Sequence, residues 1–181
     1  MWKNYNRYYT QILKSEVGSI YQSRNINQIP SVEKISLTCV SNNPNSTKSI
    51  LMILSAIQLV INKKARIVTA QDSIIMTKVR KGQPLGGKNS LTNDSVWLFL
   101  NFLTFNIMPL LDLTKFMQLK KTNNDFSFFI KSSAVFNKLK PFFNFYQFLP
   151  SIQVLFTLKN STKIDKIFLL RLLKLPVLSK K

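Results

Sequence analysis

Three of the four glycines in this chain lie in one short basic stretch, from Lys78 to Lys88. The same stretch contains Arg80, Lys81 and Pro84. Lysine and arginine side chains neutralise phosphates, and glycine lets a backbone turn through positive φ or approach a ligand closely. A nucleotide-binding P-loop is excluded, because the G-x-x-x-x-G-K-[ST] pattern is missing. We therefore expect the function of the chain to depend on this loop.

The charge of the whole chain points to a polyanionic partner. Lys and Arg number 26 against 7 Asp and Glu in 181 residues, which gives a formal net charge of +19 and a pI near 10.3. With such an excess, the positive side chains repel one another in a free compact monomer, and binding to a polyanion is favoured. Charge alone leaves two partners open, a nucleic acid and an anionic membrane surface.

The residues needed for most catalytic chemistry are missing or scattered. Histidine is absent, Cys39 is the single cysteine, and the acidic residues are far apart in sequence: Glu16, Glu33, Asp72, Asp94, Asp112, Asp125 and Asp165. These counts exclude a zinc cluster, a Cys/His or Ser/His nucleophile and a disulfide framework. A carboxylate pair assembled by the fold, as in a nuclease or a maturase, stays open without a supporting motif. We expect no enzyme, no cofactor and no small-molecule substrate.

Two apolar stretches have to be weighed as membrane segments. Ile50 to Ile61 is too short, because crossing the hydrocarbon core takes about 20 residues. Val96 to Leu113 is long enough, but it contains polar residues and Asp112, and we interpret it as a core helix. We expect no membrane insertion, and a basic peripheral membrane protein is the alternative function.

Hydrophobic periodicity predicts the elements that position the basic loop. Alternation predicts strands, and three- and four-residue spacing predicts helices. The expected strands are Val32–Thr38, Ala65–Thr69, Lys88–Thr92, Phe126–Ile130 and Ile152–Leu158. The expected helices are Asn4–Gln22, one from Ser46 or Thr47 to near Asn62, Ser95–Met108 with Asp94 as N-cap, and Ile164–Leu172 capped by Ser161 or Thr162.

The short connections between several of these strands do not allow parallel crossovers. We therefore predict one α+β domain, an antiparallel sheet with helices packed on one face and with projecting loops. Aromatic residues could stack on bases, but packing in the core or at a protein interface is favoured, most of all for the strand phenylalanines. The residues weighed in this way are Tyr8, Phe126, Phe128, Phe142, Phe143, Phe145 and Tyr146.

Two motifs in order resemble one family. Gln28 to Leu37 resembles the Q-V-P-x-V-E-K-I-x-L opening strand of the universal large-subunit ribosomal protein five family, and Lys78 to Lys88 resembles its K-I-R-x-G-x-P-I-G-x-K signature. Asp125–Ile130 and Ser151–Pro176 resemble its later strands and closing helix. The resemblance spans residues 1–181, as an N-terminal helix (1–24), an RNA-binding half (25–111) and a divergent half (112–181).

The resemblance implies a structural protein of the central protuberance of the large ribosomal subunit. Its expected partners are 5S rRNA, large-subunit rRNA, P-site tRNA, a protein of the small-subunit head and other central-protuberance proteins. The positions implied for rRNA binding are Thr38, Lys63, Lys64, Arg66, Lys88 and Ser90. Those of the loop that faces tRNA are Ser73, Met76, Thr77, Lys78, Arg80, Lys81 and Gly82, and those of the bridge to the small subunit are Lys115, Lys120 and Lys121.

Residue usage suggests where the protein works. Asn, Lys, Ile, Phe, Leu and Ser are frequent, and these residues have A/T-rich codons, which is typical of an organelle genome. The first helix of the family accounts for Asn4 to Gln22 and leaves little room for a cleavable presequence. We therefore expect a protein of the mitochondrial ribosome, in the matrix, that is encoded in the organelle.

Overall fold

The computed structural model describes residues 8–20, 29–41, 43, 46–73, 75, 78–111, 125–159, 163–173 and 175. The chain forms two compact units. The first unit comprises Met1–Ile35, Leu91–Phe128 and Phe156–Lys181, and the second unit comprises Ser36–Ser90 and Phe129–Leu155.

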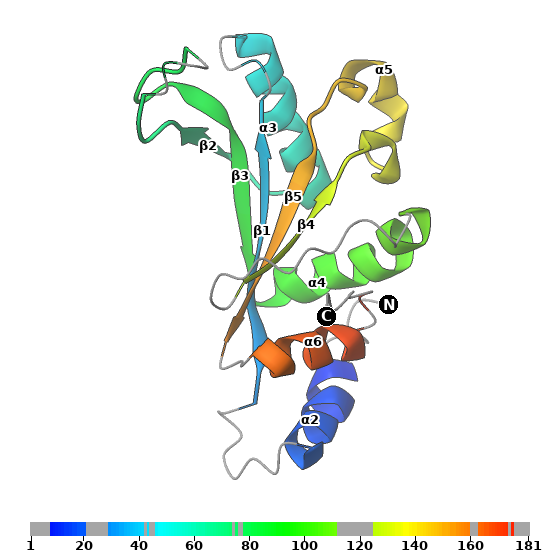
Figure 1. Cartoon of the computed structure of the whole chain (residues 1–181). Helices are drawn as coiled ribbons and strands as arrows, with labels where there is room; N and C mark the ends of the chain where they lie inside the picture. The colour runs from blue at the N-terminus through cyan, green and yellow to red at the C-terminus, as the bar shows by residue number, and fades with distance from the viewer. Residues whose placement is uncertain are drawn as a thin grey trace. The chain divides into compact units, whose positions relative to one another are not determined.

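Five strands form one antiparallel sheet (Figure 1). Their order across the sheet is β2-β3-β1-β5-β4. The predicted α+β class is confirmed. The bounds are β1 Ser31–Val40, β2 Arg66–Thr69, β3 Pro84–Thr92, β4 Asp125–Ile130 and β5 Ile152–Lys159.

Alternation in the sequence identified most of these strands correctly. In β1, Ile35, Leu37 and Cys39 are buried at every second position. In β5, Ile152, Val154, Phe156 and Leu158 repeat the pattern. One face of each strand therefore contributes to the hydrophobic core, as a period of two requires.

Helix α3, Thr47–Ile61, is the main helix of the second unit. Its buried side chains recur at helical spacing and comprise Ile50, Ile53, Ala56, Ile57 and Val60. The helix ends at Asn62, which has φ 60° and donates its backbone N–H to the Gln58 carbonyl at 2.8 Å. Asparagine tolerates this left-handed conformation better than most residues, so the predicted end near Asn62 is confirmed.

The remaining elements of the second unit are short. They are the 3-10 turns η6 Ser133–Val135 and η7 Lys140–Phe142 and the helix α5 Phe143–Tyr146. All three fall in or near a stretch that has no clear period in the sequence.

The helices of the first unit are less regular than predicted. The expected first helix is a π-helical turn, η1 Tyr8–Leu13, followed by α2 Lys14–Ile20, and the rest of the predicted range lies outside the described residues. Helix α6 is Lys163–Leu172, and its expected caps, Ser161 and Thr162, also lie outside them.

The predicted helix Ser95–Met108 needs two corrections. Its N-cap is Asn93, with φ 55°, and Asp94 is the first helical residue of α4, Asp94–Phe102. Asn adopts positive φ readily, and the Asp94 carboxylate interacts favourably with the helix dipole from the first turn. The α-helix then changes into a π-helix, η4 Leu103–Ile107, and a 3-10 turn, η5 Met108–Leu110, which contains Pro109.

The strand phenylalanines pack in the core, as predicted. Phe126 and Phe128 of β4 are fully buried with Phe156 of β5. The ring centroids of the three side chains lie 5.8 to 6.2 Å apart. Distances in this range are typical of favourable aromatic packing.

The glycine-rich stretch differs most from the prediction, because β3 begins at Pro84 and not at Lys88. Gly86 and Gly87 are strand residues. A Cβ at Gly86 would collide with the Cys39 carbonyl oxygen and lie 2.9 Å from the Val40 Cα, and a Cβ at Gly87 would lie 3.0 Å from Leu54 Cδ2. Both glycines are therefore needed for close packing, whereas only Gly82, with φ 82°, has a turn conformation.

This difference predicts unequal effects of two alanine substitutions. Gly86→Ala should lower the free energy of unfolding by about 3 kcal/mol, because the collision is with backbone that cannot rotate away. Gly82→Ala, with no atom within 4 Å of its Cβ, should lose only the about 1 to 2 kcal/mol that left-handed backbone costs an L-residue. Urea unfolding of both variants measures the two values. Equal losses would contradict the packing role of Gly86.

The buried thiol predicts a second measurable property. Burial raises the pKa of Cys39 from 9.0 to about 12. The thiol of the unfolded chain ionises first, so Cys39 does not affect stability below about pH 9, and stability falls as the pH rises from there toward 12. At about pH 8 a thiol-reactive disulfide should label the folded chain far more slowly than the same chain in urea. Equal labelling rates would show that the thiol is accessible.

Candidate nucleic-acid interface

The predicted rRNA-binding residues of β2 and β3 share one face of the sheet. Helix α3 covers the side of β3 on which Gly87 lies, since Ile53, Leu54 and Ile57 surround the space above it. Side chains alternate along a strand, so Lys88 and Ser90 point to the opposite face, and both are exposed. We call this side of β1, β2 and β3 in the second unit the open face.

Two cations of the open face are direct neighbours. Arg66 of β2 pairs with Lys88 of β3 in antiparallel register, so their side chains lie on the same side of the sheet. Like charges directly opposite one another destabilise a sheet in water. An anion placed between the two side chains would relieve this repulsion, as a phosphate group does.

Hydroxyl groups connect this side of β3 to β1. The Ser36 hydroxyl is buried and lies 3.3 Å from the exposed Ser90 hydroxyl, which places β1 beside β3 on this side. Thr38, two residues further along β1, projects to the same side and is half-buried. The structure thus brings four predicted residues, Thr38, Arg66, Lys88 and Ser90, onto one surface.

The two remaining predicted rRNA residues lie in the turn after α3. Lys63 and Lys64 are exposed, and their carbonyl oxygens accept hydrogen bonds from the Asn89 side chain, at 3.1 and 3.3 Å. Asn89 is buried on the helix side of β3. One asparagine therefore holds the Lys63–Lys64 turn, which directly precedes β2, against β3.

Sequence reasoning missed Asn89 and also Lys138. The Lys138 Nζ donates to the Val60 carbonyl at 3.1 Å and to Asn62 Oδ1 at 3.0 Å, so this lysine binds the C-terminal end of α3. A cation at this end of a helix interacts favourably with its dipole. No local motif marks either residue, because both act on partners distant in sequence.

The predicted tRNA-facing loop connects β2 to β3 and is closed at its base. The Ala70 N–H donates to the Gln83 carbonyl at 2.9 Å, and the Gly82 N–H donates to the Ala70 carbonyl at 2.9 Å. The Arg80 N–H donates to Gln83 Oε1 at 3.0 Å. Gly82 makes the reversal possible, as the sequence predicted.

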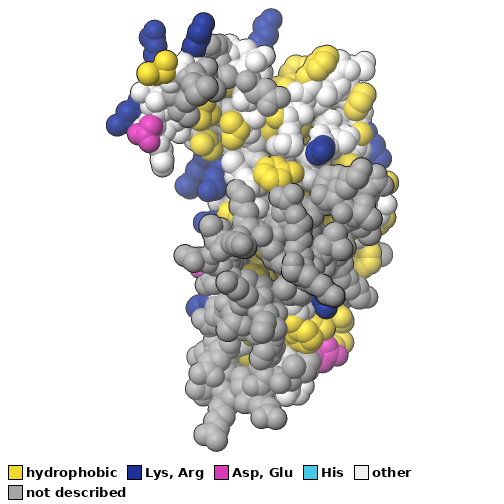
Figure 2. Space-filling model, viewed as in Figure 1, with side chains coloured by type: hydrophobic (Ala, Val, Ile, Leu, Met, Phe, Trp, Pro, Cys, Tyr) yellow, Lys and Arg dark blue, Asp and Glu magenta, His cyan; other side chains and the backbone are white. Residues whose placement is uncertain are grey.

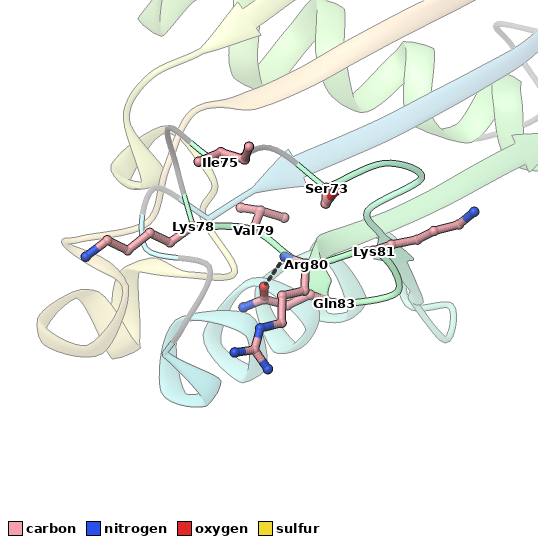
Figure 3. Close-up of a pocket in the computed structure, with 7 residues that line it drawn as sticks. All are labelled: Ser73, Ile75, Lys78, Val79, Arg80, Lys81 and Gln83. Carbon is pink, nitrogen blue, oxygen red and sulfur yellow. Dashed lines mark hydrogen bonds between the residues drawn. The ribbon is translucent and has the colours of Figure 1, made fainter.

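The loop surrounds an open hollow of about 810 Å³ (Figure 3). Its lining residues are Ser73, Ile75, Lys78, Val79, Arg80, Lys81 and Gln83. Lys78, Arg80 and Lys81 are exposed, and their side chains point away from one another and not into a common centre. This arrangement does not form a compact pocket for one phosphate, and it suits phosphates spaced along an extended backbone.

Five of the predicted site residues lie outside the described part of the chain. They are Met76 and Thr77 at the tip of the loop and Lys115, Lys120 and Lys121 of the expected bridge.

The charge around the open face and the loop is almost entirely of one sign. Between Lys63 and Lys88 the sequence has seven Lys and Arg residues, and Asp72 is the single acid. Figure 2 shows Lys and Arg side chains standing at the surface over the end of the molecule that carries β2 and its loop. A surface of this kind attracts polyanions at long range.

The described residues form neither a metal site of clustered ligands nor a membrane-spanning helix. Among the side chains that the structure describes, no three His, Cys, Asp or Glu residues lie together as ligands for a metal ion. No described helix has both the length and the apolar character for a membrane span.

Comparison with known proteins finds bacterial ribosomal proteins among the relatives of this chain. The chain is 30% identical over 106 residues to the large ribosomal subunit protein uL5 of Bdellovibrio bacteriovorus, which is 58% of this chain and 57% of the relative. It is 33% identical over 104 residues to the uL5 protein of Mycoplasmopsis synoviae, a match that covers 55% of this chain and 56% of the relative. It is 25% identical over 134 residues to the uL5 protein of Nocardia farcinica, a match that covers 72% of each chain.

The chain thus spans little more than half the length of the first two curated relatives. A search with protein-family models found no match.

The position of Asn89 predicts a specific defect. Asn89→Ala should lower the free energy of unfolding by about 1 kcal/mol, because two carbonyl groups lose their donor and can be solvated only in part. RNA affinity should fall while its salt dependence stays constant, because no cation is removed. Urea unfolding and a salt titration of RNA binding measure both effects. Asn137→Ala, at an exposed asparagine, is the matched control, and equal results for both variants would contradict the role of Asn89.

Proposed function

We propose that the chain is a structural, RNA-binding constituent of the large ribosomal subunit, because it belongs to the large ribosomal subunit protein uL5 family. The observation that carries the proposal is the adjacent pair Arg66 and Lys88 on the sheet face opposite α3. A face with paired cations and hydroxyls suits an RNA backbone. The chain acts in this proposal as one ribosomal protein domain.

The proposed ligand of the open face is rRNA, with 5S rRNA as the main partner and large-subunit rRNA as the second. Arg66, Lys88, Lys63 and Lys64 neutralise phosphates around its edge. The Thr38 and Ser90 hydroxyls, which can donate and accept, hydrogen-bond to phosphate and ribose groups. Contacts to the ribose 2′-hydroxyl would distinguish RNA from DNA.

The proposed ligand of the loop is P-site tRNA. Ser73, Lys78, Arg80 and Lys81 line its described part, and Gly82 sets its return. The diverging cations support contact with phosphates along a backbone, independent of sequence. Met76 and Thr77 would form the tip of this contact.

Two further proposals rest on the family alone. Lys115, Lys120 and Lys121 would contact a protein of the small-subunit head, and other central-protuberance proteins would adjoin the chain. The residue usage supports a mitochondrial ribosome and a gene in the organelle. Immunoblotting of gradient-purified mitochondrial ribosomes tests the location, and absence of the chain from the large subunit would refute it.

The salt dependence of 5S rRNA binding tests the main proposal. Each phosphate contact contributes to the slope of log affinity against log salt, so Lys88→Ala and Arg66→Ala should each reduce that slope by about 0.7 to 1. Filter binding over a range of salt concentrations measures it. Lys48→Ala, which removes an exposed cation from the first turn of α3, is the matched control and should leave the slope unchanged.

Two outcomes would count against this assignment. If Lys88→Ala and Lys48→Ala reduce the slope equally, binding is spread over the whole surface and the open face has no special role. If the wild-type chain shows no salt dependence, phosphate neutralisation does not drive binding.

A further inference from the structure

A second surface of the second unit exposes aromatic rings. The segment Lys140–Phe148 contains η7 and α5, and it leaves Phe142 58%, Phe143 45%, Phe145 60% and Phe148 78% exposed. Figure 2 shows hydrophobic side chains at the surface over the end of the molecule where Figure 1 places α5. These phenylalanines therefore do not pack in the core of this chain, whereas Phe126 and Phe128 do.

The segment that carries these rings is firmly attached to α3. Tyr146 is buried, and its hydroxyl lies 3.1 Å from the Ser55 hydroxyl of α3. Leu139 and Leu149 are buried on either side of the segment. The Phe145 ring packs edge-on against Tyr146, with centroids 5.0 Å apart. The exposed rings thus project from an anchored backbone, so little conformational entropy is lost when they bind a ligand.

The large apolar side chains exposed in this region are of one type. Val135, Leu139 and Leu149 are buried, together with the aromatic residues Phe136 and Tyr146. The large apolar side chains left exposed between Lys131 and Ser151 are all phenylalanines. Exposed flat rings are what a stacking surface requires.

The surroundings of the rings are positive and polar. The sequence has no acidic residue between Asp125 and Asp165, and Lys131 and Lys140 are exposed. Asn144 and Gln147, interleaved with the rings, are exposed as well and can hydrogen-bond to base edges. Aromatic rings among cations and amides, in a chain of net charge +19, are complementary to single-stranded RNA, which offers both bases and phosphates.

We propose that Phe142, Phe143, Phe145 and Phe148 form a stacking surface for unpaired RNA bases. Lys140 and Lys131 contact the phosphates of the same strand. This surface shares no residue with the open face. The inference rests on the proposed function only because its ligand is also RNA. An unpaired loop or strand end of an RNA is the fitting partner, because paired bases do not expose their faces.

Replacement of the rings by leucine tests this proposal on the full chain. The probes are a labelled short oligoadenylate and a ribose-phosphate oligomer of the same length without bases, measured by fluorescence anisotropy. The wild-type chain should prefer the oligoadenylate by about tenfold or more. The triple variant Phe142→Leu, Phe145→Leu, Phe148→Leu keeps the apolar character but loses the rings, so the preference should disappear while the salt dependence persists.

Matched variants keep the outcome clear. Phe129→Leu, at a phenylalanine of β4 that is 42% exposed, should keep the preference for bases. Phe148→Leu alone, at the most exposed ring, should lose part of it without a risk to folding, which thermal unfolding verifies.

Two results would overturn the inference. The first is a triple variant that keeps the wild-type preference for bases. If Phe145→Asp then also blocks joining of the chain to the large subunit, the surface belongs to a protein partner. The second is a wild-type chain that binds neither probe, and this result alone would also contradict the proposed RNA-binding function.

Discussion

The close packing of β3 against β1 and α3 is the constraint on which the candidate interface depends. It depends on glycine, because a Cβ at Gly86 would collide with β1 backbone and a Cβ at Gly87 would make tight contacts with α3 side chains. Once α3 covers the Gly87 side, alternation along the strand determines that Lys88 and Ser90 face outward. The glycine-rich motif therefore acts mainly through what it permits on the opposite side of the sheet.

The same packing brings positive charges together without acidic partners. Arg66 lies opposite Lys88, and Asn89 holds the Lys63–Lys64 turn that precedes β2. Folding concentrates like charges here, which is unfavourable in water and favourable against a polyanion. The proposed binding of RNA would relieve this electrostatic conflict. Lys138, bound to the end of α3, shows that one cation outside this cluster has a structural role.

Much of the fold could be predicted from local patterns. Alternation located β1, β4 and β5, and helical spacing located α3 with its end at Asn62. Prediction failed where local preference and packing disagree. Glycine is rare inside strands, so Gly86 and Gly87 suggested a loop, and only contact with distant residues explains them as strand residues. The phenylalanines divided in the same way, since Phe126 is buried in a strand and Phe145 is exposed on a short helix.

By itself the sequence determined the strong positive charge, the absence of histidine, the order of most strands and helices, and the family motifs, because these depend on residue identity and local spacing. The tertiary structure alone decided which cations are neighbours, which sheet face is left for a ligand, and which aromatic rings reach the surface. It also revealed Asn89 and Lys138 as positioning residues. These properties depend on contacts between segments far apart in the chain, and such contacts leave no local pattern.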